Sequence, residues 1–157
     1  MKEHARPVVA FDAKLERLAA LMTEIMGQQS GVGLAATQLG VLSRVIVWED
    51  PDAEGEDPLV YVNPEIEERS ESCTTEVEGC LSVPGTSVEV ERADEIVVKA
   101  QGLSGEPVVV RLKGFPARIV QHEVDHLDGR LILDRATPEE RRRALKELRE
   151  RAIAAES

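Results

Sequence analysis

The sequence lacks any long hydrophobic run. No stretch of about eighteen apolar residues occurs, which excludes a membrane-spanning helix. Residues 1–11 (MKEHARPVVAF) also lack the apolar core of a secretory signal peptide. We therefore expect a cytoplasmic protein without a membrane partner.

Basic residues are in the minority. The chain has 19 Lys and Arg against 30 Asp and Glu, a formal net charge of −11, which argues against binding of DNA or other nucleic acid by the molecule as a whole. Residues 135–151 reverse this balance, with seven basic residues against four glutamates. This tail is the only basic part of the chain.

Cysteine and histidine are also scarce, with two and three residues respectively. In a reducing cytoplasm a disulfide between Cys73 and Cys80 is not expected. The expectation is one catalytic or metal-bound thiol and one bystander. The few histidines direct attention to the short segment that contains two of them.

That segment is residues 121–126, which read QHEVDH. Histidines four residues apart on a helix lie on one face, so His122 and His126 have the spacing needed to share a metal ion. Glu123 lies beside that face, in the position of a general base. Phe115 and Ile119 extend the same face as an apolar stripe.

Two further helices are predicted, one near each end. Apolar residues recur at helical spacing over residues 12–26, with Asp12 as N-cap and Gly27 as the stop. Residues 138–155 form a C-terminal helix that begins after Thr137. Its expected packing stripe comprises Leu145, Leu148, Ala152 and Ile153.

Five short runs rich in valine and isoleucine are predicted as strands, at residues 44–48, 59–62, 87–90, 96–100 and 108–112. Because no helical pattern separates the later runs, they should pair antiparallel. At 157 residues the chain is expected to be one domain, 1–157. The fold class is α+β, with antiparallel sheets wrapped around the histidine helix.

A glycine-rich segment, GVGLAATQ at residues 31–38, formally matches the dinucleotide fingerprint GxGxxA. That fingerprint must follow a strand, whereas here a helical pattern precedes it. We interpret the glycines instead as allowing an extended backbone to approach another chain closely, with the Gln38 amide available as a donor or acceptor.

A catalytic site of this kind needs a third protein ligand. The pattern HExxHxxGxxH fails, because Ile132 stands where its third histidine belongs, and His4 lies near the terminus. Glu147 or Glu150 lies at the distance used by common zinc peptidases. Cys80, in what we read as a tight loop between strands, is the competing ligand.

Three motifs in order, GVGLAATQ, EGCLS at residues 78–82 and QHEVDH, resemble the signature motifs of peptide deformylases. The resemblance covers nearly the whole chain, except that members usually carry a further N-terminal stretch. It implies removal of the formyl group from the N-terminal formyl-methionine of nascent polypeptides, which would be the partners of this chain. It also implies ferrous iron as the native metal, with zinc, nickel or cobalt able to replace it.

The resemblance also implies a role for individual residues. The metal ligands would be Cys80, His122 and His126. Glu123 would be the acid and base, and Gln38 and the backbone N–H of Leu81 would stabilise the oxyanion. Substrate would contact Val32, Gly33, Gly79 and Ile119. A zinc endopeptidase and a non-catalytic interaction module stay as alternatives, and we expect the basic C-terminal helix to contact the ribosome.

Overall fold

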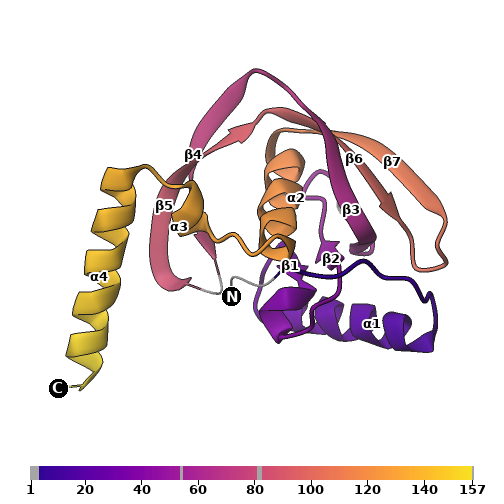
Figure 1. Ribbon diagram of the computed structural model, residues 1–157, viewed down its shortest axis with the longest axis horizontal. Coiled ribbons are helices and arrows are strands. Elements are labelled where there is room, and N and C mark those ends of the chain that lie inside the picture. Colours follow the sequence, from indigo (N-terminus) through magenta and orange to yellow (C-terminus); the bar gives the residue numbers. More distant parts are fainter. Residues whose placement is uncertain (1–3, 54, 81–82, 157) are drawn as a thin grey trace.

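The computed structural model describes residues 4–53, 55–80 and 83–156, with residues 80, 83, 84 and 156 described by their backbone alone. Figure 1 shows the arrangement of the elements. In chain order they are α1 (Ala13–Gln28), β1 (Gly33–Ala35), the 3-10 helix η1 (Ala36–Leu39), β2 (Val45–Trp48), β3 (Leu59–Arg69), β4 (Cys73–Cys80), β5 (Val83–Ala93), β6 (Glu95–Gln101), β7 (Pro107–Lys113), α2 (Gly114–Leu127), α3 (Ile132–Arg135) and α4 (Pro138–Glu156).

The strands form a five-stranded sheet in the order β1-β2-β3-β6-β7 and a two-stranded sheet of β4 and β5. Each pairing within these sheets is antiparallel. Helix α2 runs through the middle of the molecule between the two sheets, and α1 packs below the β1–β2 end (Figure 1). The predicted α+β fold with antiparallel sheets around the histidine helix is therefore confirmed.

The core lies where α2 meets the larger sheet. Strand β2 is buried at all four positions, because apolar residues with high strand propensity face α1 on one side and α2 on the other. Of the 14 residues of α2, only three are not buried, so the helix is surrounded by protein. Such a helix holds polar side chains in a fixed place, because every neighbour restrains it.

Helix α1 follows the sequence pattern at its start and departs from it at its end. The carboxylate of Asp12 accepts hydrogen bonds from the backbone N–H groups of Lys14 and Leu15, each 3.1 Å long, as predicted for an N-cap. The prediction that Gly27 ends the helix is wrong. The helix continues to Gln28, and the left-handed residue that ends it is Ser30, at φ +54°, rather than a glycine.

Strand β4 was missed by the sequence pattern, which placed Cys80 in a loop. Cys80 is instead the last residue of β4. The side chains from Cys73 to Val77 are exposed and mostly polar, so this strand shows no alternation of apolar residues. It is held by pairing with β5 along its length.

Helix α4 begins as predicted, and the Thr137 hydroxyl accepts a hydrogen bond of 3.2 Å from the backbone N–H of Glu140. The predicted leucine stripe is wrong in part, since Leu145 and Ile153 are 40% and 62% exposed. The helix packs instead through Ala144, which is fully buried. Ala144 belongs to a small apolar cluster whose buried residues are Val88, Val90, Ile132 and Ala144.

No helix within the described ranges is long and apolar enough to cross a membrane.

Candidate active site

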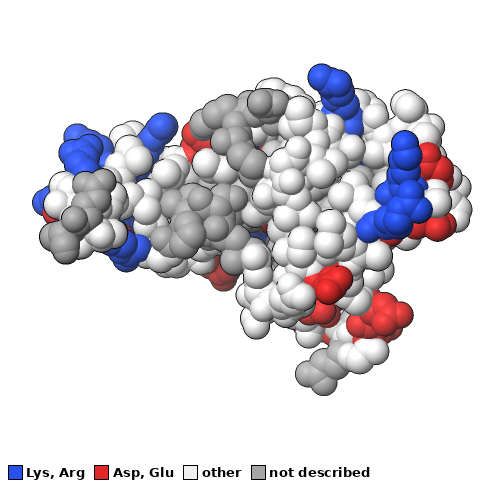
Figure 2. Space-filling model, turned by 90° about the horizontal axis from the view of Figure 1, so that it is seen from below, with Lys and Arg blue, Asp and Glu red and all other residues white. Residues whose placement is uncertain are grey.

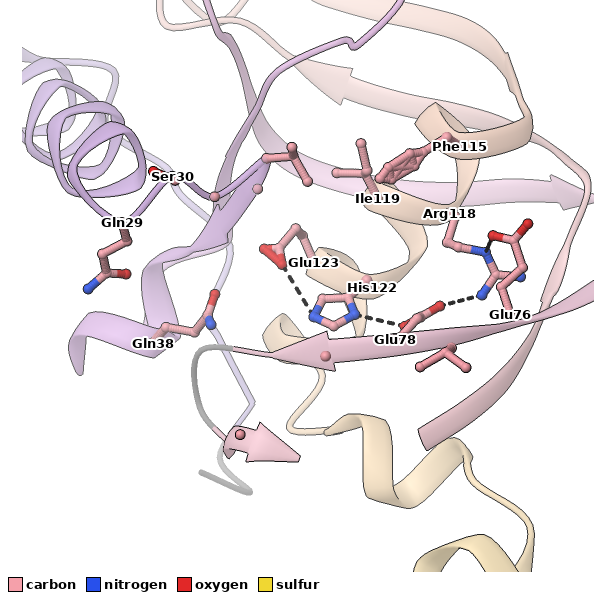
Figure 3. A pocket seen from close by; sticks show the side chains of 16 residues that line it. Gln29, Ser30, Gln38, Glu76, Glu78, Phe115, Arg118, Ile119, His122 and Glu123 are labelled. Atoms are coloured by element: carbon pink, nitrogen blue, oxygen red, sulfur yellow. Dashed lines mark hydrogen bonds and ion pairs between the residues drawn. The ribbon is translucent and has the colours of Figure 1, made fainter. Parts of the chain in front are cut away.

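A cavity of about 930 Å³ lies where α2 faces the two sheets. Residues 29–33 and Gln38 line one side, and residues 76–79 with Gly85 line the other. Helix α2 lines the cavity with Phe115, Arg118, Ile119, His122 and Glu123. Figure 3 shows His122 and Glu123 adjacent to one another on α2, with Gln38 on a separate segment of the cavity wall.

The histidine pair has the geometry predicted from its spacing. The Nε2 atoms of His122 and His126 are 3.1 Å apart. Two nitrogen ligands at about 2.1 Å from one tetrahedral ion lie about 3.4 Å apart, so this pair fits a shared divalent cation. Glu123 belongs to the same group, in which all possible ligand atoms lie within 4.8 Å of one another.

The orientation of His122 is fixed by Glu78 of β4. The Nδ1 atom of His122 lies 2.9 Å from a carboxylate oxygen of Glu78. Burial would raise the pKa of Glu78, but hydrogen bonds from His122 and Arg92 outweigh it and lower this pKa to about 2. Because an ionised carboxylate only accepts, Nδ1 is the ring nitrogen that donates to Glu78, and Nε2 is the ring nitrogen that faces His126 and Glu123.

Glu78 belongs to a buried network of charges. Arg92 of β5 donates two hydrogen bonds of 2.9 and 3.0 Å to its carboxylate, and Arg118 of α2 donates another. Arg92 also donates to Asp125, which accepts from Arg135 at 2.7 and 3.0 Å. The network therefore joins β4, β5, α2 and α3 around the imidazole of His122.

Glycine at position 33 permits β1 to approach α2. A Cβ atom there would lie 2.9 Å from Cγ of Glu123 and 3.1 Å from Cγ2 of Ile119. Both distances are shorter than ordinary carbon–carbon contacts. The absence of a side chain at Gly33 therefore lets β1 lie against the part of α2 that carries Glu123. The expected approach of this glycine backbone to another chain stays a prediction.

Gln38 is oriented by its own turn. The backbone N–H of Ala35 donates a hydrogen bond of 2.8 Å to Oε1 of Gln38. Because a backbone N–H can only donate, this bond assigns the oxygen end of the amide. The Nε2 end is therefore the donor end of the Gln38 amide, which lines the cavity.

The remaining predicted site residues divide into two groups. Val32, Gly79 and Ile119 line the cavity, and Val32 is 41% exposed. The Cys80 side chain and Leu81 lie outside the described residues. Cys73 carries a free, exposed thiol.

Comparisons with known proteins identify the family. The family model described as polypeptide deformylase matches residues 1–142. The chain belongs to the polypeptide deformylase family. The peptide deformylase of Dictyoglomus thermophilum is 51% identical over 139 residues, 88% of each chain. That of Desulforudis audaxviator is 47% identical over 137 residues, 87% of each chain.

Solved deformylase structures have the same fold. The peptide deformylase of Thermotoga maritima aligns with a TM-score of 0.82 and 43% identity, over 87% of this chain and 90% of that one. Arabidopsis thaliana peptide deformylase 1B aligns with a TM-score of 0.90 and 34% identity, over 99% of this chain and 86% of that one. The family resemblance seen in the three motifs is therefore confirmed.

This deformylase is an enzyme of protein biosynthesis that removes the formyl group from nascent polypeptides, and its family consists of metalloenzymes. The endopeptidase and interaction-module alternatives are not supported. Glu147, one of the two glutamates considered with Glu150 as the endopeptidase ligand, bonds to Arg143 within α4 at 2.7 Å. The possible metal ligands grouped with His122 among the described residues include no glutamate of α4.

Sequence reasoning missed the residues that support His122. Glu78 was recognised only as a letter of the EGCLS motif, and Arg92 and Arg118 were not singled out. One signal was available for Arg92, because it follows Val88 and Val90 at alternate positions of one strand. A charged residue on the apolar face of a strand indicates a buried partner of opposite charge.

We predict that Gly33→Ala lowers kcat by about 100-fold, because the new methyl group displaces Glu123 from its place beside His122. The matched control is Gly27→Ala, since nothing lies within 4 Å of a Cβ atom there. That variant should keep full activity and gain up to about 1 kcal/mol of stability. Steady-state kinetics and urea unfolding of both variants check this, and an unchanged kcat for Gly33→Ala would contradict it.

Proposed function

We propose that this deformylase removes the formyl group with a divalent metal ion held by Cys80, His122 and His126. The observation that carries the proposal is the 3.1 Å separation of the Nε2 atoms of His126 and His122, of which His122 lines the cavity together with Glu123 and Gln38. Backbone placement supports Cys80 as the third ligand. It ends β4 two residues after Glu78, whose carboxylate contacts His122.

The donor set of one thiolate and two imidazoles suits ferrous iron, which we propose as the native metal, and zinc, nickel or cobalt as replacements. When bound, such an ion would lower the pKa of a water ligand toward about 7 and polarise the formyl oxygen. The Glu78 carboxylate would raise the basicity of His122 and keep its ring in place.

Glu123 is proposed as the proton carrier. The residue is 3% exposed, and its Oε1 lies 3.7 Å from Nε2 of His122. A carboxylate in this position can accept a proton from the attacking water and deliver it to the departing amine. The products would be formate and a free N-terminal methionine.

Negative charge on the formyl oxygen would be stabilised by two donors, the Gln38 Nε2 and the backbone N–H of Leu81. The bond from Ala35 to Gln38 holds the amide in its orientation before substrate arrives. Removing one donor of such a pair typically costs about 3 to 4 kcal/mol of transition-state stabilisation.

The peptide is proposed to bind as an added strand between β1 and β4. Each of these strands lies at the edge of its sheet, and both border the cavity through Gly33 and Gly79. An extended peptide there can bond to either edge through its backbone. Val32 and Ile119 would contact the methionine side chain.

We further propose that the enzyme acts in the cytoplasm and contacts the ribosome through the basic helix α4. Figure 2 shows Lys and Arg side chains gathered at the left end of the molecule, where Figure 1 places α4. The cations at Arg141 and Lys146 are exposed. Ribosomal RNA would attract them in spite of the net charge of −11.

The function is tested by formate release from a formyl-methionyl tripeptide, with protein loaded anaerobically with ferrous iron. We expect turnover by the parent and a loss of about 1000-fold or more in Glu123→Ala, because the proton then has no carrier. Bound iron is measured in both proteins. Equal turnover by the two would exclude the role of Glu123.

The identity of the third metal ligand is tested by replacing each of the two cysteines in turn. Cys80→Ala should retain almost no Zn²⁺ after gel filtration, whereas Cys73→Ala, which removes an exposed thiol, should retain about one ion per chain. Elemental analysis gives the ratio. Retention of zinc by Cys80→Ala would show that another side chain completes the site.

Ribosome contact is tested by charge reversal. We expect Arg141→Glu with Lys146→Glu to reduce co-sedimentation with ribosomes at low salt by about fivefold, because phosphate contacts are lost. The control reverses two exposed cations of α1, Lys14 and Arg17. An equal effect of both pairs would indicate a response to net charge and not a contact through α4.

A further inference from the structure

Helix α4 makes direct hydrogen bonds to the start of β5. The guanidinium of Arg143 donates a bond of 2.9 Å to the backbone carbonyl of Ser87. Arg151 donates to the backbone carbonyl of Gly85 and, at 3.4 Å, to the hydroxyl of Thr86. In return, a carboxylate oxygen of Glu140 accepts a bond of 3.3 Å from the backbone N–H of Glu89. These contacts hold one short segment, residues 85–89, from end to end.

The donors are held in place by their own helix. Arg143 bonds to Glu140 and Glu147 at 2.8 and 2.7 Å, and these bonds raise the pKa of Arg143 above its usual range. Ala144, one residue on, is fully buried beside β5. Because its side chain is a single methyl group, the helix can lie close enough for both arginines to reach the strand.

The segment that α4 holds borders the active-site cavity. Gly85 lines the cavity on the side opposite to residues 29–33. Its φ angle is +75°, in the left-handed region that favours glycine, and its carbonyl group is the one that Arg151 engages. Thr86, the next residue, is only 3% exposed. Gly85 is therefore a point at which α4 contacts the rim of the cavity.

We propose that Arg143 and Arg151 are positioning residues that set this rim for the peptide residues following formyl-methionine. The inference rests on the proposed function. His122 and Glu123, which act on the formyl group, lie on α2, whereas Gly85, the part of the rim that α4 holds, lies in β5. A loosened rim should therefore weaken binding of long substrates and leave the chemical step unchanged.

Helix α4 supplies its own control. Arg142 and Arg149 are seven residues apart and share a face, which lies opposite to Ala144. Both side chains are exposed. Removing them takes away the same charge as removing Arg143 and Arg151, but leaves every contact to residues 85–89 in place.

The experiment uses two double variants. The first combines Arg143→Ala and Arg151→Ala, and the second, which is the control, combines Arg142→Ala and Arg149→Ala. Each is assayed for formate release from formyl-methionine amide and from a formyl-methionyl tetrapeptide. For the first pair we expect KM for the tetrapeptide to rise about tenfold at unchanged kcat, with less than about twofold change for the short substrate. The second pair should match the parent on both.

Amide hydrogen exchange at residues 85–88, measured without substrate, provides a readout that does not depend on turnover. We expect exchange about fivefold faster or more in the first pair only. Arg151→Lys should restore parental exchange there, because one carbonyl needs one donor. If neither the parent nor any variant releases formate, the proposed function fails. Hydrogen exchange at residues 85–88 then still tests whether Arg143 and Arg151 hold the rim. Parental exchange and KM in the first pair, or equal changes in both pairs, would overturn the proposal.

Discussion

The ion pair between Glu78 and Arg92 is the constraint on which the rest of the site depends. A buried carboxylate is costly unless its charge and its lone pairs are satisfied, and removing one partner of such a pair typically costs about 3 to 5 kcal/mol. Here two arginines and the His122 ring satisfy one carboxylate. The polar strand β4, which contributes little apolar surface, is thereby fixed to α2, and the same bonds select the ring nitrogen that faces the cavity. Stability and site geometry therefore come from one interaction.

Small residues determine how closely the elements approach one another. At Gly33 the absence of a side chain brings the edge strand β1 against Glu123, and at Ala144 a single methyl group brings α4 against β5. In both cases a larger side chain would separate a rigid element from the strand that borders the cavity. The cavity is consequently bordered by strand backbone held close to α2, which suits recognition of a peptide through its main chain.

Elements that show a local periodicity of apolar residues were predictable from the sequence. Elements that are held by contacts with residues far away in the sequence were not. The spacing of His122 and His126 predicted the helix and the shared face, because helical periodicity is a property of the chain itself. The strands with alternating or continuous apolar residues were found for the same reason. Strand β4 was missed because it is held by its hydrogen bonds to β5 and by Glu78, whose partners lie 14 to 44 residues away. Gly27 failed as a stop because the left-handed residue that ends α1 is Ser30, three residues later, where the backbone N–H of Gly31 donates to the carbonyl of Met26.

The basic residues of α4 and of the segment before it have different roles in the structure, which composition alone does not show. Read as a sequence, residues 135–151 form one cationic tail suited to an anionic partner. In the folded chain the cations separate by face. Arg135 neutralises Asp125, and Arg143 and Arg151 bond to carbonyl groups of β5, while Arg142 and Arg149 face solvent. A guanidinium is suited to the inner positions, because its several donors can bond to a carbonyl and a carboxylate together. Any partner attracted to the outer face would thus meet a helix whose inner face touches the rim of the active site.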